Sequence, residues 1–391
     1  MIGTSRPTVM RPEKNTSSLL GDFFGFAIKG STSGNTTMKI AFFGSSLVSA
    51  YWNGAATYYR GLLSALHQRG HHITFYEPDA YQRQQHRDLA DPEYADVVVY
   101  PAQHASQVVD VVRQAAGSDL VVKASGVGVF DDVLERAVLE LRPPDARVVF
   151  WDVDAAATLE RMDEDPNDAL RLLIPQYDAI FTYGGGAPVV DAYLNFGAKA
   201  CHPIYNALDP ATHFPVPPEN RFAAALGFLG NRLPDRESRV REFFFKPATA
   251  LKSRDFIIGG NGWQDGESTN VRCLGHIYTA DHNAFNSTPL AVLNICRDSM
   301  ARCGFSPPTR LFEAAGAGGC LITDDWQGIE AFLEPERECL VARDGAEVAA
   351  ILDTLDPARA RAIGRAALTR VRAEHTYAQR AETVDAIIGE L

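Results

Sequence analysis

The fold is decided by GFSPPTRLFEAAGAGG (residues 304–319), which runs directly into CLITD (residues 320–324). Pro308 suits the first turn of a helix, because its missing N–H leaves no hydrogen bond unmade there. The glycines near the end of the stretch let this helix pack closely on the apolar strand that follows. A helix that leads through a glycine turn into a short buried strand is the repeating unit of a parallel α/β sheet.

The same alternation of helices and short apolar runs extends over the rest of the chain. The runs are continuously apolar, which is typical of parallel strands that are covered on both faces. We therefore predict an α/β fold with two Rossmann-like, doubly wound domains that face each other across a cleft. The predicted strands are 40–44, 72–76, 96–100, 120–123, 148–152, 179–183, 225–229, 256–258, 272–274, 291–295, 320–323 and 339–341.

A proline-rich stretch at residues 209–218 separates the two series of strands and is typical of a hinge. It places the N-terminal domain at residues 38–215 and the C-terminal domain at residues 216–375. Residues 1–37 are rich in Ser, Thr, Gly and Asn and have no sustained periodicity, so we expect a disordered tail. Helical patterns close the chain, and the last of them lies within residues 376–391.

The composition limits the classes of partner and the location. With 46% hydrophobic and 22% charged residues, the chain of 391 residues is typical of a globular protein. A net charge of -12 argues against a large nucleic-acid interface, which needs clustered Lys and Arg. Six cysteines without C-x-x-C spacing indicate reduced thiols and a cytoplasmic protein. No run approaches 18 apolar residues, so we expect no membrane span.

The helix start near Pro308 favours an anion. The turn from Ser306 to Thr309 presents N–H groups and the positive end of the helix, which suits a phosphate. Arg310 adds a forked, permanent charge for a diphosphate, and Glu313 is placed one turn further to accept hydrogen bonds from ribose hydroxyls. The alternative is a surface ion pair between Arg310 and Glu313 on an ordinary helix.

This segment resembles the donor-binding signature of GT-B glycosyltransferases, especially of the CgeB-like group with its pattern S-P-x-T-R-x-F-E-A-x-x-x-G. The likeness extends from about residue 294 to the final helices and is weaker over the first domain. It implies a transferase that holds a nucleotide-sugar in its second domain and needs neither a metal nor another cofactor. Residues 376–391 resemble the family's closing helix, which crosses back onto the first domain. Many relatives carry a glutamate eight positions before the ribose-binding one, where this chain has Phe305.

Two further places carry a resemblance to the family's basic residues. Gly230, Asn231 and Arg232 follow the first strand of the second domain, where similar enzymes turn a basic residue toward the donor phosphates and the glycine lets the backbone approach. Arg297 follows the predicted strand 291–295 and resembles another basic residue of the family. In both places the alternative is a plain turn with a solvated arginine.

Three residues are candidates for the catalytic base. Asp152 and Asp154 end a strand of the first domain and bring two carboxylates to its edge, where one of them can reach an acceptor hydroxyl. His276 follows a strand of the second domain and can face the sugar or the phosphates. The alternatives are a helix cap and a turn carboxylate for the two aspartates, and a structural role for the histidine.

The loop at residues 44–54 follows the first strand of the first domain. It contains no G-x-G-x-x-G, which weakens any interpretation as a nicotinamide or flavin site. The resemblance implies that Tyr51, Trp52 and Asn53 contact sugar rings. The alternative is a helix-capping asparagine beside packed aromatic side chains.

Together these features predict a glycosyltransferase that moves a sugar from a nucleotide-sugar to a hydroxyl of an unknown acceptor. The resemblance to the family implies that the donor is a UDP-sugar. The acceptor is either a glycan or a small molecule. Two other functions fit the same architecture. One is a nucleotide-sugar epimerase, and the other is a noncatalytic two-lobed protein that binds a sugar or a nucleotide.

Overall fold

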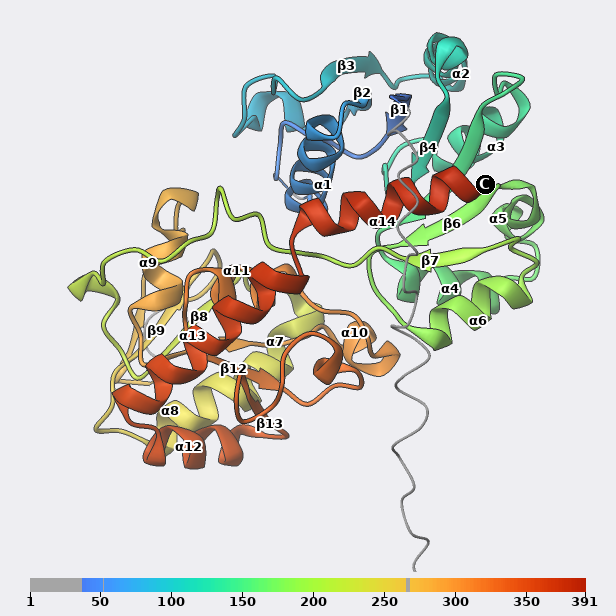
Figure 1. The fold of residues 1–391 in the computed structure, drawn as a ribbon. Helices are drawn as coiled ribbons and strands as arrows, with labels where there is room; N and C mark the ends of the chain where they lie inside the picture. The colour runs from blue at the N-terminus through green and yellow to red at the C-terminus, as the bar shows by residue number, and fades with distance from the viewer. Residues whose placement is uncertain (1–36, 52, 265–267) are drawn as a thin grey trace, which may run out of the picture. The chain divides into compact units, whose positions relative to one another are not determined.

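The computed structural model describes residues 37–51, 53–264 and 268–391. These residues form two β-sheets in which every pair of neighbouring strands is parallel, and helices flank both sheets (Figure 1). The predicted α/β fold with two doubly wound sheets is confirmed. The tail predicted at residues 1–37 lies, except for its last residue, outside the described residues, as does Trp52. None of the helices in the described part of the chain is long and apolar enough to cross a membrane.

The first sheet has seven strands in the order β3-β2-β1-β4-β5-β6-β7. The six predicted strands are present within two or three residues at each end. The seventh, β7, was missed because it is only three residues long and only its first residue is fully buried. The strands are β1 (Lys39–Phe43), β2 (His72–Asp79), β3 (Asp96–Pro101), β4 (Leu120–Ala124), β5 (Arg147–Asp152), β6 (Ala179–Thr182) and β7 (Cys201–Pro203).

Six helices follow the strands of the first sheet, and apolar clusters lie against both of its faces. The first helix begins at Ala56, so the alternative in which Asn53 caps it is wrong. The amide of Asn53 instead donates to the carbonyls of Ser46 and Ser49, at 2.7 and 3.0 Å, and thereby closes the preceding loop. The helices are α1 (Ala56–Gln68), α2 (Ala105–Arg113), α3 (Asp131–Glu140), α4 (Ala155–Glu164), α5 (Ala169–Leu173) and α6 (Ala187–Asn195).

The second sheet has six strands in the order β10-β9-β8-β11-β12-β13. Its strands are β8 (Leu226–Leu229), β9 (Phe256–Gly259), β10 (Val271–Cys273), β11 (Ala291–Asn294), β12 (Leu321–Asp324) and β13 (Leu340–Ala342). Its helices are α7 (Pro234–Val240), α8 (Lys246–Ala250), α9 (His282–Ser287), α10 (Asp298–Cys303), α11 (Thr309–Gly316), α12 (Gly345–Thr354) and α13 (Pro357–Glu374).

The final helix, α14 (Tyr377–Glu390), packs on α1 of the first sheet (Figure 1). It contributes Tyr377 and three aliphatic side chains to the apolar cluster on that face of the sheet. Gly61 of α1 is what permits the approach, because a Cβ on Gly61 would lie 2.2 Å from the Tyr377 ring. The chain therefore leaves the first sheet after β7 and returns to it at its very end.

His375 lies where α13 passes into α14 and is only 3% exposed. Its Nδ1 lies 3.0 Å from the Arg380 guanidinium, which can only donate, so this nitrogen carries no proton. Burial, followed by the charges of Arg380 and Arg370, lowers the pKa of His375 to about 3.

We expect the free energy of unfolding to fall as the pH drops below about 6.5, because His375 then binds a proton in the unfolded chain but not in the folded protein. The loss from this group approaches about 1.4 kcal/mol per pH unit well below pH 6.5 and amounts to about 1.6 kcal/mol between pH 6.5 and pH 5. Urea unfolding of His375→Gln across this range should show a correspondingly shallower slope. An unchanged slope in His375→Gln, or an equal reduction in the exposed control His67→Gln, would contradict the assignment.

Candidate active site

A cavity of about 540 Å³ is lined by loops that follow strands of both sheets. Ser45, Ser125 and Asp154 follow β1, β4 and β5 of the first sheet. Arg236 and Arg297 come from the segments after β8 and β11 of the second sheet. Because ligands of parallel α/β sheets bind at the carboxyl ends of the strands, this cavity is the candidate active site.

Asp152 and Asp154 are separated by the structure into two different environments. Asp152 is fully buried and accepts hydrogen bonds from Ser125 Oγ at 2.7 Å, from Thr158 Oγ1 at 3.0 Å and from the Tyr193 hydroxyl. It also accepts from the backbone N–H of Asp154 at 2.9 Å. Asp152 is thus a poor candidate for the base and holds the loop that carries Asp154, whereas Asp154 lines the cavity.

Two guanidinium groups line the cavity from the second sheet. Arg297 follows β11, as the sequence placed it. Arg236, in the first turn of α7, donates to the carbonyl of Asn231 at 2.7 Å and lies against Gly230, where a Cβ would meet its Nη2 at 2.7 Å. The backbone of Gly230 and Asn231 therefore supports this guanidinium.

Arg232, by contrast, is not among the residues that line the cavity. It forms a two-pronged pair with Glu237, with distances of 2.9 and 2.5 Å, and its guanidinium lies over the Trp263 ring. The residue of this segment that lines the cavity is Arg236, about one helical turn further along the chain.

The start of α11 meets the cavity through Pro308 and Thr309. Ser306 is buried, and its hydroxyl donates to the carbonyl of Gly304 at 2.9 Å, so it shapes the turn before the helix. Asn206, from the segment after β7, donates to the carbonyl of Pro307 at 3.1 Å. Asn206 therefore holds the turn before α11 to the segment that follows β7 of the first sheet.

Glu313 and Arg310 lie on α11 outside the residues that line the cavity. Arg310 Nη1 is 3.0 Å from Glu313 Oε2, and the two side chains are 21% and 13% exposed, so the ion pair that sequence reasoning held as an alternative is present but largely buried. Burial opposes ionisation of Glu313, but the charge of Arg310, with smaller contributions from His213 and His282, outweighs it and lowers the pKa below its ordinary value. The carboxylate is ionised and available to hydroxyl donors.

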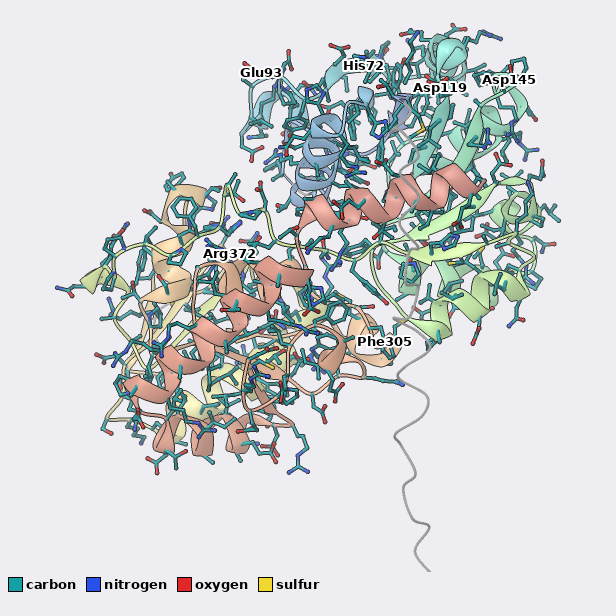
Figure 2. All side chains as sticks on the ribbon, viewed as in Figure 1. His72, Glu93, Asp119, Asp145, Phe305 and Arg372 are labelled. Carbon is teal, nitrogen blue, oxygen red and sulfur yellow. The ribbon has the colours of Figure 1, made fainter. Side chains whose placement is uncertain are left out.

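Phe305, labelled in Figure 2, occupies the position at which many GT-B relatives carry a glutamate. Its ring fills the space beside two glycines, since a Cβ on Gly186 would lie 2.6 Å from it and a Cβ on Gly328 would lie 2.3 Å from it. Its carbonyl accepts from the N–H of Gly185 at 2.8 Å. Phe305 thus joins the segment before α6 to the second sheet, and it supplies no carboxylate.

Of the remaining sequence candidates in the described part of the chain, only Asn53 lines the cavity. His276 is exposed, packs edge-on against Tyr278 and does not line the cavity. Tyr51 stacks on His86 with 4.1 Å between ring centroids, whereas Asn53 lines the cavity while holding its own loop. Tyr183 was not predicted to be a site residue, and burial raises its pKa to about 12, so its hydroxyl remains protonated and able to donate.

Solved structures with the same fold span nearly the whole chain. The complex of Anabaena Alr3699/HepE with UDP and glucose is 15% identical with a TM-score of 0.64, and the match covers 90% of this chain and 100% of that one. Sucrose-phosphate synthase from Thermosynechococcus elongatus is 14% identical with a TM-score of 0.62, covering 90% and 98% of the two chains. An alpha-glucosyltransferase in complex with UDP-glucose and DNA containing an abasic site is 11% identical with a TM-score of 0.63, covering 90% and 100%.

These likenesses establish the fold, and a sequence match establishes the activity class. Residues 236–386 match the model of the family described as Glycosyl transferase-like. The chain is a glycosyltransferase of the GT-B fold. No curated protein matches this glycosyltransferase in sequence.

Sequence reasoning missed three arginines that line this glycosyltransferase's cavity, namely Arg83, Arg161 and Arg236. Arg236 carried a usable signal, since it stands in the first turn of the helix after the Gly230 turn. Arg83 carried none, because it lies in a single short 3-10 helix (Arg83–His86) after β2. It is 6% exposed, lines the cavity and donates to the carbonyl of Ser45 at 3.0 Å. Only the folded loop brings it to the site.

Proposed function

We propose that this glycosyltransferase moves a hexosyl group from a UDP-sugar to a hydroxyl of a glycan or a small molecule, and that it is a cytoplasmic enzyme of the CgeB-like group. The observation that supports the proposal most directly is the composition of the cavity. It combines a carboxylate from the first sheet, Asp154, with two guanidinium groups from the second, Arg236 and Arg297. One wall suits an acceptor hydroxyl and the other suits a diphosphate.

The diphosphate of the donor binds at the start of α11, between Thr309, Arg236 and Arg297. As the bond between the sugar C1 and the phosphate oxygen breaks, negative charge grows on the leaving UDP. Guanidinium groups and helix N–H groups that are already in place stabilise this charge without reorganisation, which is usually the largest contribution to such a reaction. In this proposal the arginines take over the charge neutralisation, so that the transfer needs no metal or other cofactor.

The acceptor enters from the first sheet. Its hydroxyl oxygen forms the new bond to C1, and Asp154 accepts the hydroxyl proton. Asp152 acts on this step indirectly, through its hydrogen bond to the backbone of Asp154. The Tyr183 hydroxyl and Asn53 line the same wall and suit the other hydroxyls of a sugar or polyol.

The ribose of the donor binds to Glu313, beside the diphosphate. We expect Glu313→Ala to weaken UDP binding by about 10- to 100-fold, since hydrogen bonds to charged groups are worth about 1.5–3 kcal/mol. Arg310→Ala should also weaken UDP binding, because Arg310 lies 3.0 Å from the Glu313 carboxylate and holds it in place. Isothermal titration calorimetry with UDP measures this directly. Asp353→Ala, an exposed carboxylate on α12, is the matched control and should bind UDP as the unchanged protein does. Unchanged affinity in both site variants would refute this placement of the ribose.

The activity itself is tested with a panel of UDP-, GDP- and TDP-sugars, by following nucleotide release with and without candidate acceptors. We expect release from UDP-sugars that rises when an acceptor hydroxyl is supplied. Release of no nucleotide from any donor, with a panel of sugar acceptors present, would overturn the proposal. An epimerase would interconvert the sugar and release no nucleotide.

A further inference from the structure

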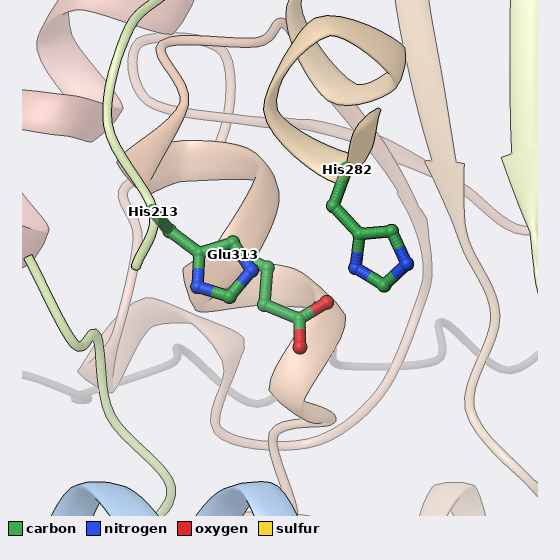
Figure 3. A group of neighbouring side chains, drawn as sticks. All are labelled: His213, His282 and Glu313. Atoms are coloured by element: carbon green, nitrogen blue, oxygen red, sulfur yellow. The ribbon is translucent and has the colours of Figure 1, made fainter. Parts of the chain in front are cut away.

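Three side chains that come from separate parts of the chain converge beside α11. His213 lies in the connection between β7 and β8, His282 begins α9, and Glu313 lies in the middle of α11. One nitrogen of each imidazole and one oxygen of the carboxylate all lie within 4.8 Å of one another. Figure 3 shows the two rings and the carboxylate gathered in one place. The proposed function uses only Glu313 of these three residues.

Hydrogen bonds fix the proton of the His213 ring. The Thr212 hydroxyl donates to the carbonyl of Asp209 at 3.2 Å, so at 2.9 Å it accepts from His213 Nδ1, which carries the proton. Nε2 is then left with its lone pair. This nitrogen has no hydrogen-bond partner among the described residues, although the side chain is only 6% exposed.

His282 and Glu313 each also have an atom that can bind a metal ion. His282 Nε2 lies 3.2 Å from the carbonyl oxygen of Ile277, which can only accept, so the proton is on Nε2 and the lone pair is on Nδ1. Glu313 Oε2 contacts Arg310 but makes no hydrogen bond to the described residues.

We propose that His213, His282 and Glu313 bind one divalent transition-metal ion, and that this ion is Zn²⁺. Two neutral imidazoles and a carboxylate are ligands that Zn²⁺ accepts, whereas Mg²⁺ and Ca²⁺ prefer oxygen alone. Each imidazole already donates its other N–H to an oxygen, as metal-bound histidines usually do. In a tetrahedral zinc site with bonds of about 2.0–2.2 Å, the ligand atoms lie about 3.3–3.6 Å apart, so the three side chains must approach one another by up to about 1.5 Å when the ion binds.

The site would act as a switch on donor binding, a consequence that rests on the proposed function. Zinc needs the carboxylate of Glu313, which the donor ribose also needs. Occupancy by the ion and binding of the nucleotide are therefore mutually exclusive. The ion would also tie the connection between the two sheets, through His213, to α9 and α11.

The test uses the full chain after treatment with EDTA and desalting, with Zn²⁺ alone as the probe in calorimetry. We expect one ion to bind, and we expect His213→Gln, His282→Gln and Glu313→Gln each to weaken binding by at least about 10- to 100-fold. His67→Gln, an exposed histidine on α1, is the matched control and should bind as the unchanged chain does. Thr212→Val leaves all three ligands in place and should weaken binding by about 10-fold through loss of its bond to Nδ1.

Cobalt distinguishes this site from the six free cysteines. Co²⁺ bound to nitrogen and oxygen gives visible absorption bands without the strong near-ultraviolet band of a thiolate ligand. Equal affinity in all three ligand variants, or a thiolate band, would overturn the metal site. Thermal unfolding of each variant checks that the chain is folded.

Titration of UDP in the presence of EDTA and then in the presence of Zn²⁺ separates the two proposals. UDP binding that is weaker in the presence of Zn²⁺ than in the presence of EDTA supports the switch. Absence of UDP binding even in EDTA would count against the proposed donor site while leaving the metal site intact. Equal UDP binding in both conditions, with zinc bound, would remove the mutual exclusion.

Discussion

Asp154→Asn is expected to lower kcat by about 10²- to 10⁴-fold, the range that a positioned general base contributes. The amide is nearly the same size as the carboxylate and keeps the backbone N–H that donates to Asp152, so the loop should retain its position. What is lost is the ability to accept the proton of the acceptor hydroxyl. Initial rates of UDP release with saturating donor and acceptor measure the effect.

The control for Asp154→Asn is Asp163→Asn, an exposed carboxylate on α4, the helix that directly follows Asp154, and it should leave kcat unchanged. UDP binding to Asp154→Asn should also be unchanged, because the diphosphate binds to the other wall of the cavity. A loss of UDP affinity that equals the loss of rate would show that the residue supports the site rather than taking the proton. A rate within a few-fold of the unchanged enzyme would remove Asp154 from the mechanism.

The double variant Arg236→Ala, Arg297→Ala is expected to weaken UDP binding by about 10²- to 10⁴-fold. Each guanidinium that meets a phosphate contributes about 1.5–3 kcal/mol, and removal of both leaves the helix start of α11 as the main anion site. Binding of uridine, which carries no phosphate, should change little. Calorimetry with UDP and with uridine separates the two contributions.

Arg302→Ala removes an exposed arginine of α10 close in sequence to Arg297 and serves as the charge-matched control. It should bind UDP normally, apart from a small effect that disappears at higher salt. Equal losses for UDP and uridine in the double variant would mean that the substitutions disturb the fold of the site. No loss for UDP would place the diphosphate elsewhere.

The fold could be predicted because its information is local. Apolar runs such as residues 40–44 and 320–323 are continuous, short and bounded by glycines, and these features do not depend on distant partners. Prediction failed where tertiary contacts override local preference. The strand β7 exists because it pairs with β6, and the helix after Asn53 starts late because the side chain bonds across its own loop.

The site was only half predictable, for a related reason. Arg310 and Glu313 share one helix, so their spacing alone puts them together. The choice between Arg232 and Arg236 depends on which way α7 faces, which depends on the packing of Gly230. His213 comes from another part of the chain than Glu313, and no local sequence pattern predicts that the two side chains lie close together.

The packing of α14 on α1 has a consequence for how the protein folds during its synthesis. Synthesis proceeds from the N-terminus, and domains often fold as they emerge from the ribosome. Here every strand of the first sheet is made long before α14, which carries four buried side chains of that sheet's apolar cluster: Tyr377, Ala381, Val384 and Ile388. The first sheet therefore has an apolar surface open to water until α14 has been translated.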